Sequence, residues 1–257
     1  MARRFPPRVR PIAPDEHLST EEHLTELRDR LVVCAAVIAS AFIVVYLARG
    51  RLIALLTAPL PHAHHKLTTF SPTEPFTTTV GAVFWASIVI SLPVLIYQAY
   101  AFAAPAISSP SRRRMLVTAG VLSGLFVAGV SFTYVMVLPT ALRFLIGFGG
   151  SAYDVQLRAN EYLSFVTTLL IAGGIVFELP VVMVSLARLG IAGTRAFQAH
   201  RRFAIIVMTV VAGVLPGGDA VSMLMLLGAE VVLYEVGIIA CRLFGTDPAS
   251  ASLGTAI

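Results

Sequence analysis

Apolar residues gather in six long runs that are separated by shorter polar stretches. About 20 apolar residues in a row make a helix long enough to cross the ~30 Å hydrocarbon core of a membrane. The pattern therefore predicts an all-α membrane protein with six transmembrane helices. Within the third run, Gly120-x-x-x-Gly124 predicts a face for close helix packing. The six runs are Leu31–Leu47, Val80–Phe102, Met115–Leu138, Tyr162–Leu186, Phe203–Leu215 and Val221–Cys241.

The fourth run, Tyr162–Leu186, contains a single charged residue, Glu178, with Pro180 two positions later. Proline has no N–H to donate to the carbonyl of Val176, so a helix kink is predicted here. A carboxylate within the membrane costs roughly 3 kcal/mol on insertion scales. Two interpretations stay open. Glu178 either forms a polar notch for a substrate or a proton, or it is a protonated, satisfied residue that holds two helices together.

The last two runs are predicted to form a short hairpin. Phe203–Leu215 has 13 residues, which make only about 20 Å of helix. The final run is interrupted by Glu230 and Glu235, and a tight turn, Pro216–Ala220, joins the two runs. Helices five and six are therefore both expected to be short, and local membrane thinning is the expected response.

The overall composition agrees with a membrane protein that crosses the bilayer several times. Hydrophobic residues make up 57% of the chain and charged residues 13%, and the mean hydropathy is +0.83. These values exclude an ordinary soluble domain. No short apolar segment follows the opening Met-Ala-Arg-Arg, so no cleavable signal peptide is expected. We expect a flexible basic cytoplasmic tail over residues 1–18, one membrane domain over 19–244, and a second flexible cytoplasmic tail over 245–257.

The distribution of lysine and arginine predicts the orientation of the chain. Cytoplasmic connections carry an excess of these residues. The side with both termini has 14 of them: Arg3, Arg4, Arg8, Arg10, Arg28, Arg30, Arg112, Arg113, Arg114, Arg188, Arg195, Arg201, Arg202 and Arg242. The other side has five: Arg49, Arg51, Lys66, Arg143 and Arg158. Both termini are therefore predicted to be cytoplasmic, and the net charge of +5 reflects membrane topology rather than nucleic-acid binding.

An acidic stripe is predicted on the helix that precedes the first span. Ser19–Glu22 forms a capping box that starts this helix. Its leucines recur at helical spacing, so the segment is expected to lie along the cytoplasmic interface before it enters the membrane. Glu22, Glu26 and Asp29 share one face. Either this face binds a cationic partner, or Glu26 simply pairs with Arg30 at i+4, and the spacing alone favours the pair.

Sequence signatures of catalysis are missing. The chain has no nucleophile elbow, no phosphate-binding loop and no H-E-x-x-H motif. His62, His64 and His65 have no cysteine or carboxylate beside them, so they predict a solvated loop. We therefore expect no enzymatic activity, no cofactor and no metal site.

The N-terminal helix also carries a motif that resembles a known family. The segment His23–Leu31 is similar to the H-L-x-E-L-R-x-R-L opening of TatC, the receptor subunit of the twin-arginine protein translocase. The resemblance covers roughly residues 19–244, and the ordered set of motifs is more specific than any one of them. It continues through Thr57–Leu60, Ser71–Phe76, Leu92–Gln98, Ala101–Ala106, Tyr162–Phe165 and Phe177–Val181.

The resemblance implies a role in protein export. TatC proteins bind precursors with Arg-Arg signal peptides on the cytoplasmic side. They work with TatA- and TatB-type single-span subunits to move folded proteins across the bacterial plasma (inner) membrane, using the proton-motive force. The resemblance further implies a concave, glove-like bundle of six helices in the lipid bilayer, assembled as a homo- or hetero-oligomer. No nucleic-acid partner is implied.

The same resemblance assigns roles to individual residues. Glu26 would accept the arginines of the signal peptide, since guanidinium–carboxylate pairs are strong and directional. Arg28 matches the adjacent arginine of the family, and Phe102 matches an aromatic of the first cytoplasmic loop. Glu178 matches a membrane-embedded glutamate that lines the concave face.

Two positions depart from the family pattern. Ser111 stands where many members have an acidic residue, so either Glu22 or Asp29 substitutes for it or recognition is less stringent. Met223 stands where some members have a polar glutamine in the last helix. Glu230 and Glu235 are then the remaining polar groups of that helix and are possible partner contacts, together with Met223.

A function from another class was also considered. In a six-span solute transporter, Glu178 would be a proton or cation site. Such transporters often contain two related halves with paired broken helices, and the sequence shows no internal symmetry of this kind. Crosslinking to a signal peptide would separate the two functions.

Overall fold

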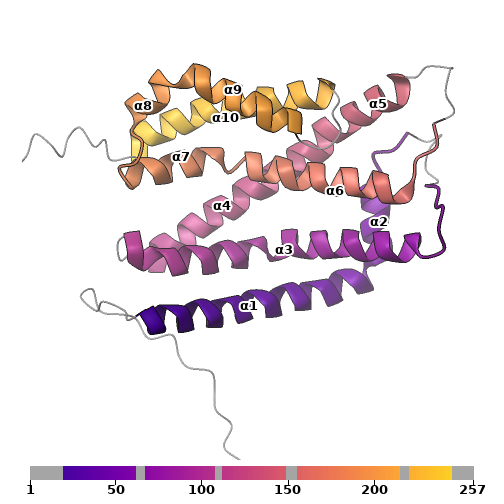
Figure 1. The fold of residues 1–257 in the computed structure, drawn as a ribbon, viewed down its shortest axis with the longest axis horizontal. Coiled ribbons are helices and arrows are strands. Elements are labelled where there is room, and N and C mark those ends of the chain that lie inside the picture. The colour runs from indigo at the N-terminus through magenta and orange to yellow at the C-terminus, as the bar shows by residue number, and fades with distance from the viewer. Residues whose placement is uncertain (1–19, 62–66, 108–111, 149–154, 215–219, 245–257) are drawn as a thin grey trace, which may run out of the picture.

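A computed structural model describes residues 20–61, 67–107, 112–148, 155–214 and 220–244. Apart from an isolated bridge between Thr68 and Arg158, regular structure in these ranges is helical (Figure 1). The predicted tails, Ser19 and most of the predicted turn after the fifth run lie outside them. The helices are α1 (Thr20–Leu47), α2 (Arg49–Thr57), α3 (Glu74–Ile107), α4 (Arg112–Phe132), the π-helix η2 (Thr133–Val137), α5 (Leu138–Phe148), α6 (Ala159–Val176), α7 (Leu179–Arg188), α8 (Thr194–Ala199), α9 (Arg201–Val214) and α10 (Ala220–Phe244).

Five helical segments in the described ranges are long and apolar enough to cross a membrane, which confirms the all-α membrane class. Helix α9 has 14 residues, about 21 Å, so the prediction of a short fifth helix is confirmed. Helix α10 has 25 residues, about 37 Å, so the prediction that the sixth is also short was wrong. Its two carboxylates do not end the helix, because Glu230 is buried and Glu235 forms an ion pair with Arg201.

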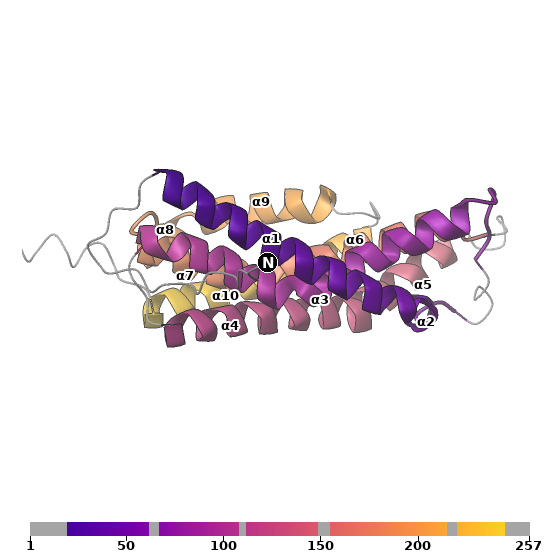
Figure 2. The same cartoon turned by 90° about the horizontal axis from the view of Figure 1, so that it is seen from below.

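The first helix also differs from its predicted course. Helix α1 runs without interruption for 28 residues and follows the bundle along its length (Figure 2). The segment His23–Leu31, which was expected to lie along the cytoplasmic interface, is continuous with the first span in a single helix. The region contains no proline or glycine to bend it, and Arg30 ties it to α3 through hydrogen bonds to Gln98 and to the carbonyl of Ala101.

Two groups of buried apolar side chains hold the bundle together. The first apolar cluster joins α2, α3, η2, α5, α6, α9 and α10, and its largest fully buried members include Leu138, Leu169 and Leu226. The second apolar cluster joins α7, α9 and α10 and consists of Met183, Ala187, Met208, Tyr234, Ile238 and Cys241. Leu227 packs against both clusters, so they adjoin along α10.

Close packing between α4 and α6 depends on glycines other than those predicted. Gly120 and Gly124 have no neighbouring atom within 4 Å of the position a Cβ would take, so their expected packing role was wrong for the described part of this chain. A Cβ at Gly173 would instead collide with the Thr133 hydroxyl, and one at Gly129 would collide with the Phe177 ring. These two positions let the helix backbones approach closely.

Candidate functional site

Glu26 lies near the start of α1 with only one carboxylate oxygen engaged. Arg30, one turn later, donates from Nε (3.0 Å) and Nη2 (2.5 Å) to Oε1 of Glu26. The same guanidinium donates from Nη1 to Oε1 of Gln98 (3.0 Å) and from Nη2 to the carbonyl of Ala101 (3.3 Å) on α3. Oε2 of Glu26 is covered and has no hydrogen-bond partner among the described residues. The arginine is thus fixed by two helices, and the carboxylate keeps spare acceptor capacity.

The i+4 pair that the spacing favoured is present, but it does not use the whole carboxylate. An ionised carboxylate can accept several N–H donors, and arginine often binds both oxygens at once. Arg30 binds one oxygen of Glu26 with two nitrogens. Both side chains are largely buried, with 18% of Arg30 and 22% of Glu26 exposed. The site is therefore partly desolvated, where a further guanidinium contact is stronger than on an open surface.

The other residues predicted at this site occupy different environments. Phe102 is half-buried, follows directly on Ala101, and belongs to α3 rather than to a loop. Arg28 is exposed and donates to Asp29 from Nε (3.0 Å) and Nη2 (2.9 Å). Glu22 lies in the first turn of α1. Ser111 falls outside the described residues.

Glu178 sits at the break between two apolar helices. Helix α6 ends at Val176 and α7 begins at Leu179 with Pro180 in its first turn, so the predicted kink is confirmed (Figure 1). Both oxygens of Glu178 are covered, and within the described ranges neither has a hydrogen-bond partner. The structure thus places a carboxylate without a hydrogen-bond partner at the kink. The interpretation of Glu178 as a satisfied helix-to-helix tie finds no hydrogen bond to support it.

The three residues predicted on the last helix separate into different surroundings. Glu230 is 3% exposed and faces the interior of its own bundle. Glu235 is about half exposed and accepts a hydrogen bond of 2.9 Å from Nη2 of Arg201. Met223 is partly buried against the first apolar cluster. Glu235 is therefore much more accessible than Glu230.

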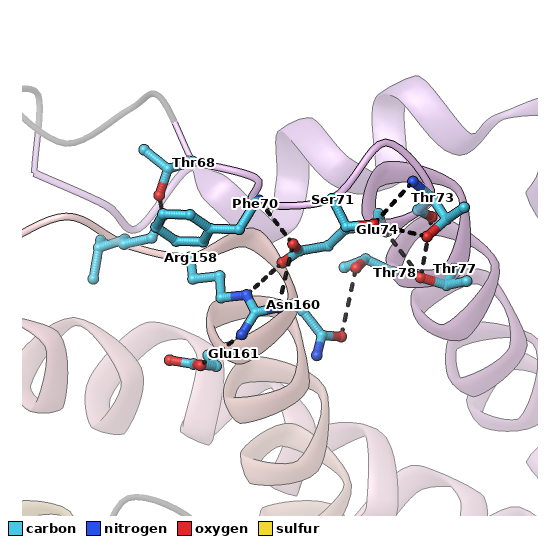
Figure 3. Close-up of polar contacts among 11 residues, drawn as sticks. Thr68, Phe70, Ser71, Thr73, Glu74, Thr77, Thr78, Arg158, Asn160 and Glu161 are labelled. Carbon is cyan, nitrogen blue, oxygen red and sulfur yellow. Dashed lines mark hydrogen bonds and ion pairs between the residues drawn. The ribbon is translucent and has the colours of Figure 1, made fainter.

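At the opposite end of the bundle, Figure 3 shows an ion pair that the sequence analysis did not find. Nε of Arg158 donates to Oε1 of Glu74 (2.8 Å), and Oε2 accepts from the Phe70 N–H (3.0 Å) and from Nη2 of Arg158 (3.4 Å). The Glu74 carboxylate raises the pKa of the Arg158 guanidinium above its usual value. The guanidinium also lies 5.6 Å from the centre of the Phe70 ring.

This ion pair joins the two long connections of the chain. Hydrogen bonds from the Thr68 N–H to the Leu157 carbonyl and from the Ala159 N–H to the Thr68 carbonyl, 2.9 Å each, add a backbone bridge. Residues 84 positions apart are thereby held together. The sequence offered only a weak signal, an acidic residue between two prolines and an isolated arginine before an apolar run.

Metal binding has no support in the described ranges, which hold no group of three or more metal-ligating side chains. Cys34 is partly buried, Cys241 is buried, and the two do not form a disulfide. The three histidines near residue 64 lie beyond the residues that the structure describes.

Comparison with known proteins gives concordant matches. The family model described as Sec-independent protein translocase protein (TatC) matches residues 22–228. The TatC protein of Desulforapulum autotrophicum is 32% identical over 227 residues, which cover 87% of this chain and 84% of that protein. That of Deinococcus radiodurans is 33% identical over 232 residues, covering 87% and 85%. A crystal structure described as the twin-arginine translocase receptor TatC superposes with a TM-score of 0.74 at 29% identity, over 86% of this chain and 99% of that one.

Proposed function

The chain belongs to the TatC family of Sec-independent protein translocase proteins, and from this membership we propose how its polar groups act in protein export. It is a translocase subunit and a receptor of the twin-arginine translocase, not an enzyme. We therefore set aside the alternative of a solute transporter.

We propose that Glu26 binds the arginines of the signal peptide. The observation that carries this assignment is the uneven use of its carboxylate, with Oε1 held by Arg30 and Oε2 without a partner in the described part of the chain. An incoming guanidinium that displaces the atoms covering Oε2 can bind this oxygen while Arg30 keeps the carboxylate in place. Lysine cannot reproduce the planar two-nitrogen geometry of arginine, so the site would distinguish Arg-Arg from Lys-Lys.

The surrounding residues support such a site. Arg30 is anchored to α3 through Gln98 and Ala101, so the first and second long helices position Glu26 together. Phe102, the next residue of α3, offers an aromatic surface to the peptide. In this proposal Glu22, one turn before Glu26, supplies the second acidic group in place of the family's loop carboxylate, and Arg28 flanks the site.

We further propose that the chain crosses a bacterial plasma membrane six times with both termini in the cytoplasm. The five long apolar segments and the short α9 are consistent with this topology. TatA- and TatB-type single-span subunits would be its partners, with Glu235 and Met223 on α10 as candidate contact positions, whereas Glu230 is too deeply buried for such a contact. Folded precursors would cross at the expense of the proton-motive force, with Glu178 acting inside the bilayer.

The direct test is photo-crosslinking in membranes to a signal peptide that bears Arg-Arg, with a Lys-Lys peptide as the control. We expect a crosslink near Glu26 that Lys-Lys does not give and that Glu26→Gln removes. The matched control is Asp29→Asn, since Asp29 lies on the same helix but is bound to Arg28. An Arg-Arg crosslink of full strength in Glu26→Gln would exclude Glu26 from the site.

The topology has its own test. Cysteine or epitope tags at the two termini should resist membrane-impermeant reagents added outside intact cells and react after the cells are opened. A C-terminal tag that reacts in intact cells would overturn the six-span arrangement. A tag in the 149–154 connection serves as the positive control, because the proposed topology places that connection outside.

A further inference from the structure

Glu230 is a second carboxylate within the apolar part of the bundle. It lies on the inward stripe of α10, one turn after Leu226 and one turn before Tyr234. Leu226 belongs to the first apolar cluster and Tyr234 to the second. The carboxyl group is therefore located where the two clusters adjoin, and the residue is only 3% exposed.

The groups around Glu230 leave one of its oxygens without a partner. Oε2 is covered and accepts no hydrogen bond from any described residue. The charged residues of the described elements that pack against α10 point elsewhere: Arg143 of α5, Arg188 of α7, Arg195 of α8, and Arg201 and Arg202 of α9 are all on the exposed side of their helices, and Arg201 is bound to Glu235. Burial of an ionised carboxylate without a counter-charge is very costly. The group is therefore stable here only when it carries a proton.

Two contacts fix how α10 is aligned with α7. A Cβ at Gly237 would lie 3.3 Å from Cα of Pro180, and Nε of Arg188 donates to the carbonyl of Phe244 at 3.2 Å. The two helices therefore run in the same direction. Glu230 precedes Gly237 by seven residues, about 10 Å along the α10 axis.

Another buried polar group without a described partner lies on an element that packs against α10. The hydroxyl oxygen of Thr133 is fully buried and has no hydrogen-bond partner in the described ranges. Thr133 opens the π-helix η2, which packs against both α6 and α10. Short π-helical segments are frequent at functional sites.

We propose that Glu230 is a second proton-binding carboxyl of this subunit, located where the two apolar clusters adjoin. A carboxylate oxygen forms an O–H bond when it takes up a proton, and the bond breaks when the proton leaves and the carboxylate forms again. The proposal deepens the proposed function, on which it rests, by adding a site for the proton that drives export. It also assigns Glu230 an interior role, distinct from a contact with a partner helix.

The first test is infrared spectroscopy of the full chain in phospholipid vesicles at neutral pH. A protonated carboxyl group gives a C=O band that ionised carboxylates lack. We expect this band to lose intensity in Glu230→Gln, with an additional loss in the double variant with Glu178→Gln. Glu230→Asp, which keeps the acid, should shift the band instead of removing it and serves if the glutamine variant does not fold. A band unchanged in both single Glu230 variants would overturn the proposal.

The second test separates proton binding from packing and from signal recognition. We expect Glu230→Gln and Glu230→Met, which both preserve volume, to lower export of an Arg-Arg reporter about tenfold or more, while the signal-peptide crosslink near Glu26 persists. Export at the wild-type rate in Glu230→Met would refute a proton-binding role. If the wild-type protein gave no Arg-Arg crosslink near Glu26, the proposed function itself would be refuted. The two outcomes are therefore distinguishable.

Discussion

Two glutamate–arginine pairs at opposite ends of the bundle differ in how many of their carboxylate oxygens accept hydrogen bonds. In the pair of Glu74 and Arg158, both carboxylate oxygens accept hydrogen bonds, and Glu74 is 5% exposed. In the pair of Glu26 and Arg30, one oxygen accepts both bonds from the arginine and the other accepts none from the described residues. The first pair joins two connections far apart in sequence, whereas the second is local to one helix and braced by another.

The difference indicates different roles for chemically identical partners. Removing one partner of a fully hydrogen-bonded ion pair destabilises the structure, because it leaves an uncompensated charge. A carboxylate with one unused oxygen can bind a further donor without losing its support. Glu178 is a third case, because neither of its oxygens accepts a hydrogen bond from a described residue. The predictions below test whether the number of engaged oxygens separates stability from binding and transport.

The largest effect is expected for Arg158→Met. The substitution leaves the Glu74 carboxylate without its cation, so we expect a clear loss in the free energy of unfolding, the largest among these variants. Denaturant titration of the purified protein in detergent, followed by circular dichroism, measures this change. The matched control is Glu161→Gln, because Glu161 contacts the same arginine at 3.4 Å but is 73% exposed, and we expect a change below about 0.5 kcal/mol. Equal losses in the free energy of unfolding for the two variants would show that the fully hydrogen-bonded pair of Glu74 and Arg158 contributes no more to stability than an exposed contact.

Glu26→Gln should affect binding more than stability. A hydrogen bond to a charged group contributes about 2 kcal/mol, so we expect the affinity for an Arg-Arg signal peptide to fall about 30-fold. Fluorescence titration of a labelled peptide on protein in nanodiscs measures the affinity, and thermal unfolding of the same samples measures stability. If Glu26→Gln lowered stability strongly but left the peptide affinity unchanged, Glu26 would have a structural role like that of Glu74 and would not be part of the binding site.

Glu178→Ala tests the group with no partner. Its removal breaks no hydrogen bond to a described residue, so we expect normal peptide binding. We expect lower export, because ionisable groups within the membrane commonly mark substrate or proton pathways. Export of an Arg-Arg reporter in intact cells gives the rate, and the nanodisc titration gives the binding. Glu178→Gln, which keeps the shape but cannot ionise, distinguishes a need for charge from a need for volume. Unchanged export in both variants would leave Glu178 with a packing role only.

The sequence predicted the features that depend on nearby residues. The kink at Pro180 and the short α9 follow from a missing N–H and from a count of apolar residues, and both are confirmed. The length of α10 was not predictable in this way, because Glu235 is stabilised by Arg201, which lies 34 residues earlier. The pairing of Glu74 with Arg158 escaped notice for the same reason. Side chains that meet only through the fold leave no periodic signal in the sequence.

The glycines show that sequence spacing alone also does not predict which residues lie at a helix contact. Gly120 and Gly124 have the spacing of a packing motif but contact nothing in the described structure, whereas Gly173 is pressed against Thr133. Spacing identifies a smooth helix face, but the arrangement of the other helices decides which face is used. The unpaired oxygen of Glu26 could likewise not be predicted from the sequence. The i+4 spacing predicts that Glu26 and Arg30 form a pair, but not which carboxylate oxygen accepts the hydrogen bonds.

The smallest effect is expected for Asp29→Asn. Asp29 and Arg28 form a pair whose side chains are 51% and 71% exposed, and such surface pairs contribute about 0–1 kcal/mol. We therefore expect the free energy of unfolding to change by less than about 0.5 kcal/mol and peptide affinity by less than about twofold. The same denaturant and nanodisc titrations measure both. A loss of binding as large as that of Glu26→Gln would mean that the acidic stripe acts as a unit through its net charge, and the hydrogen bonding of the individual oxygens would then not decide where the signal peptide binds.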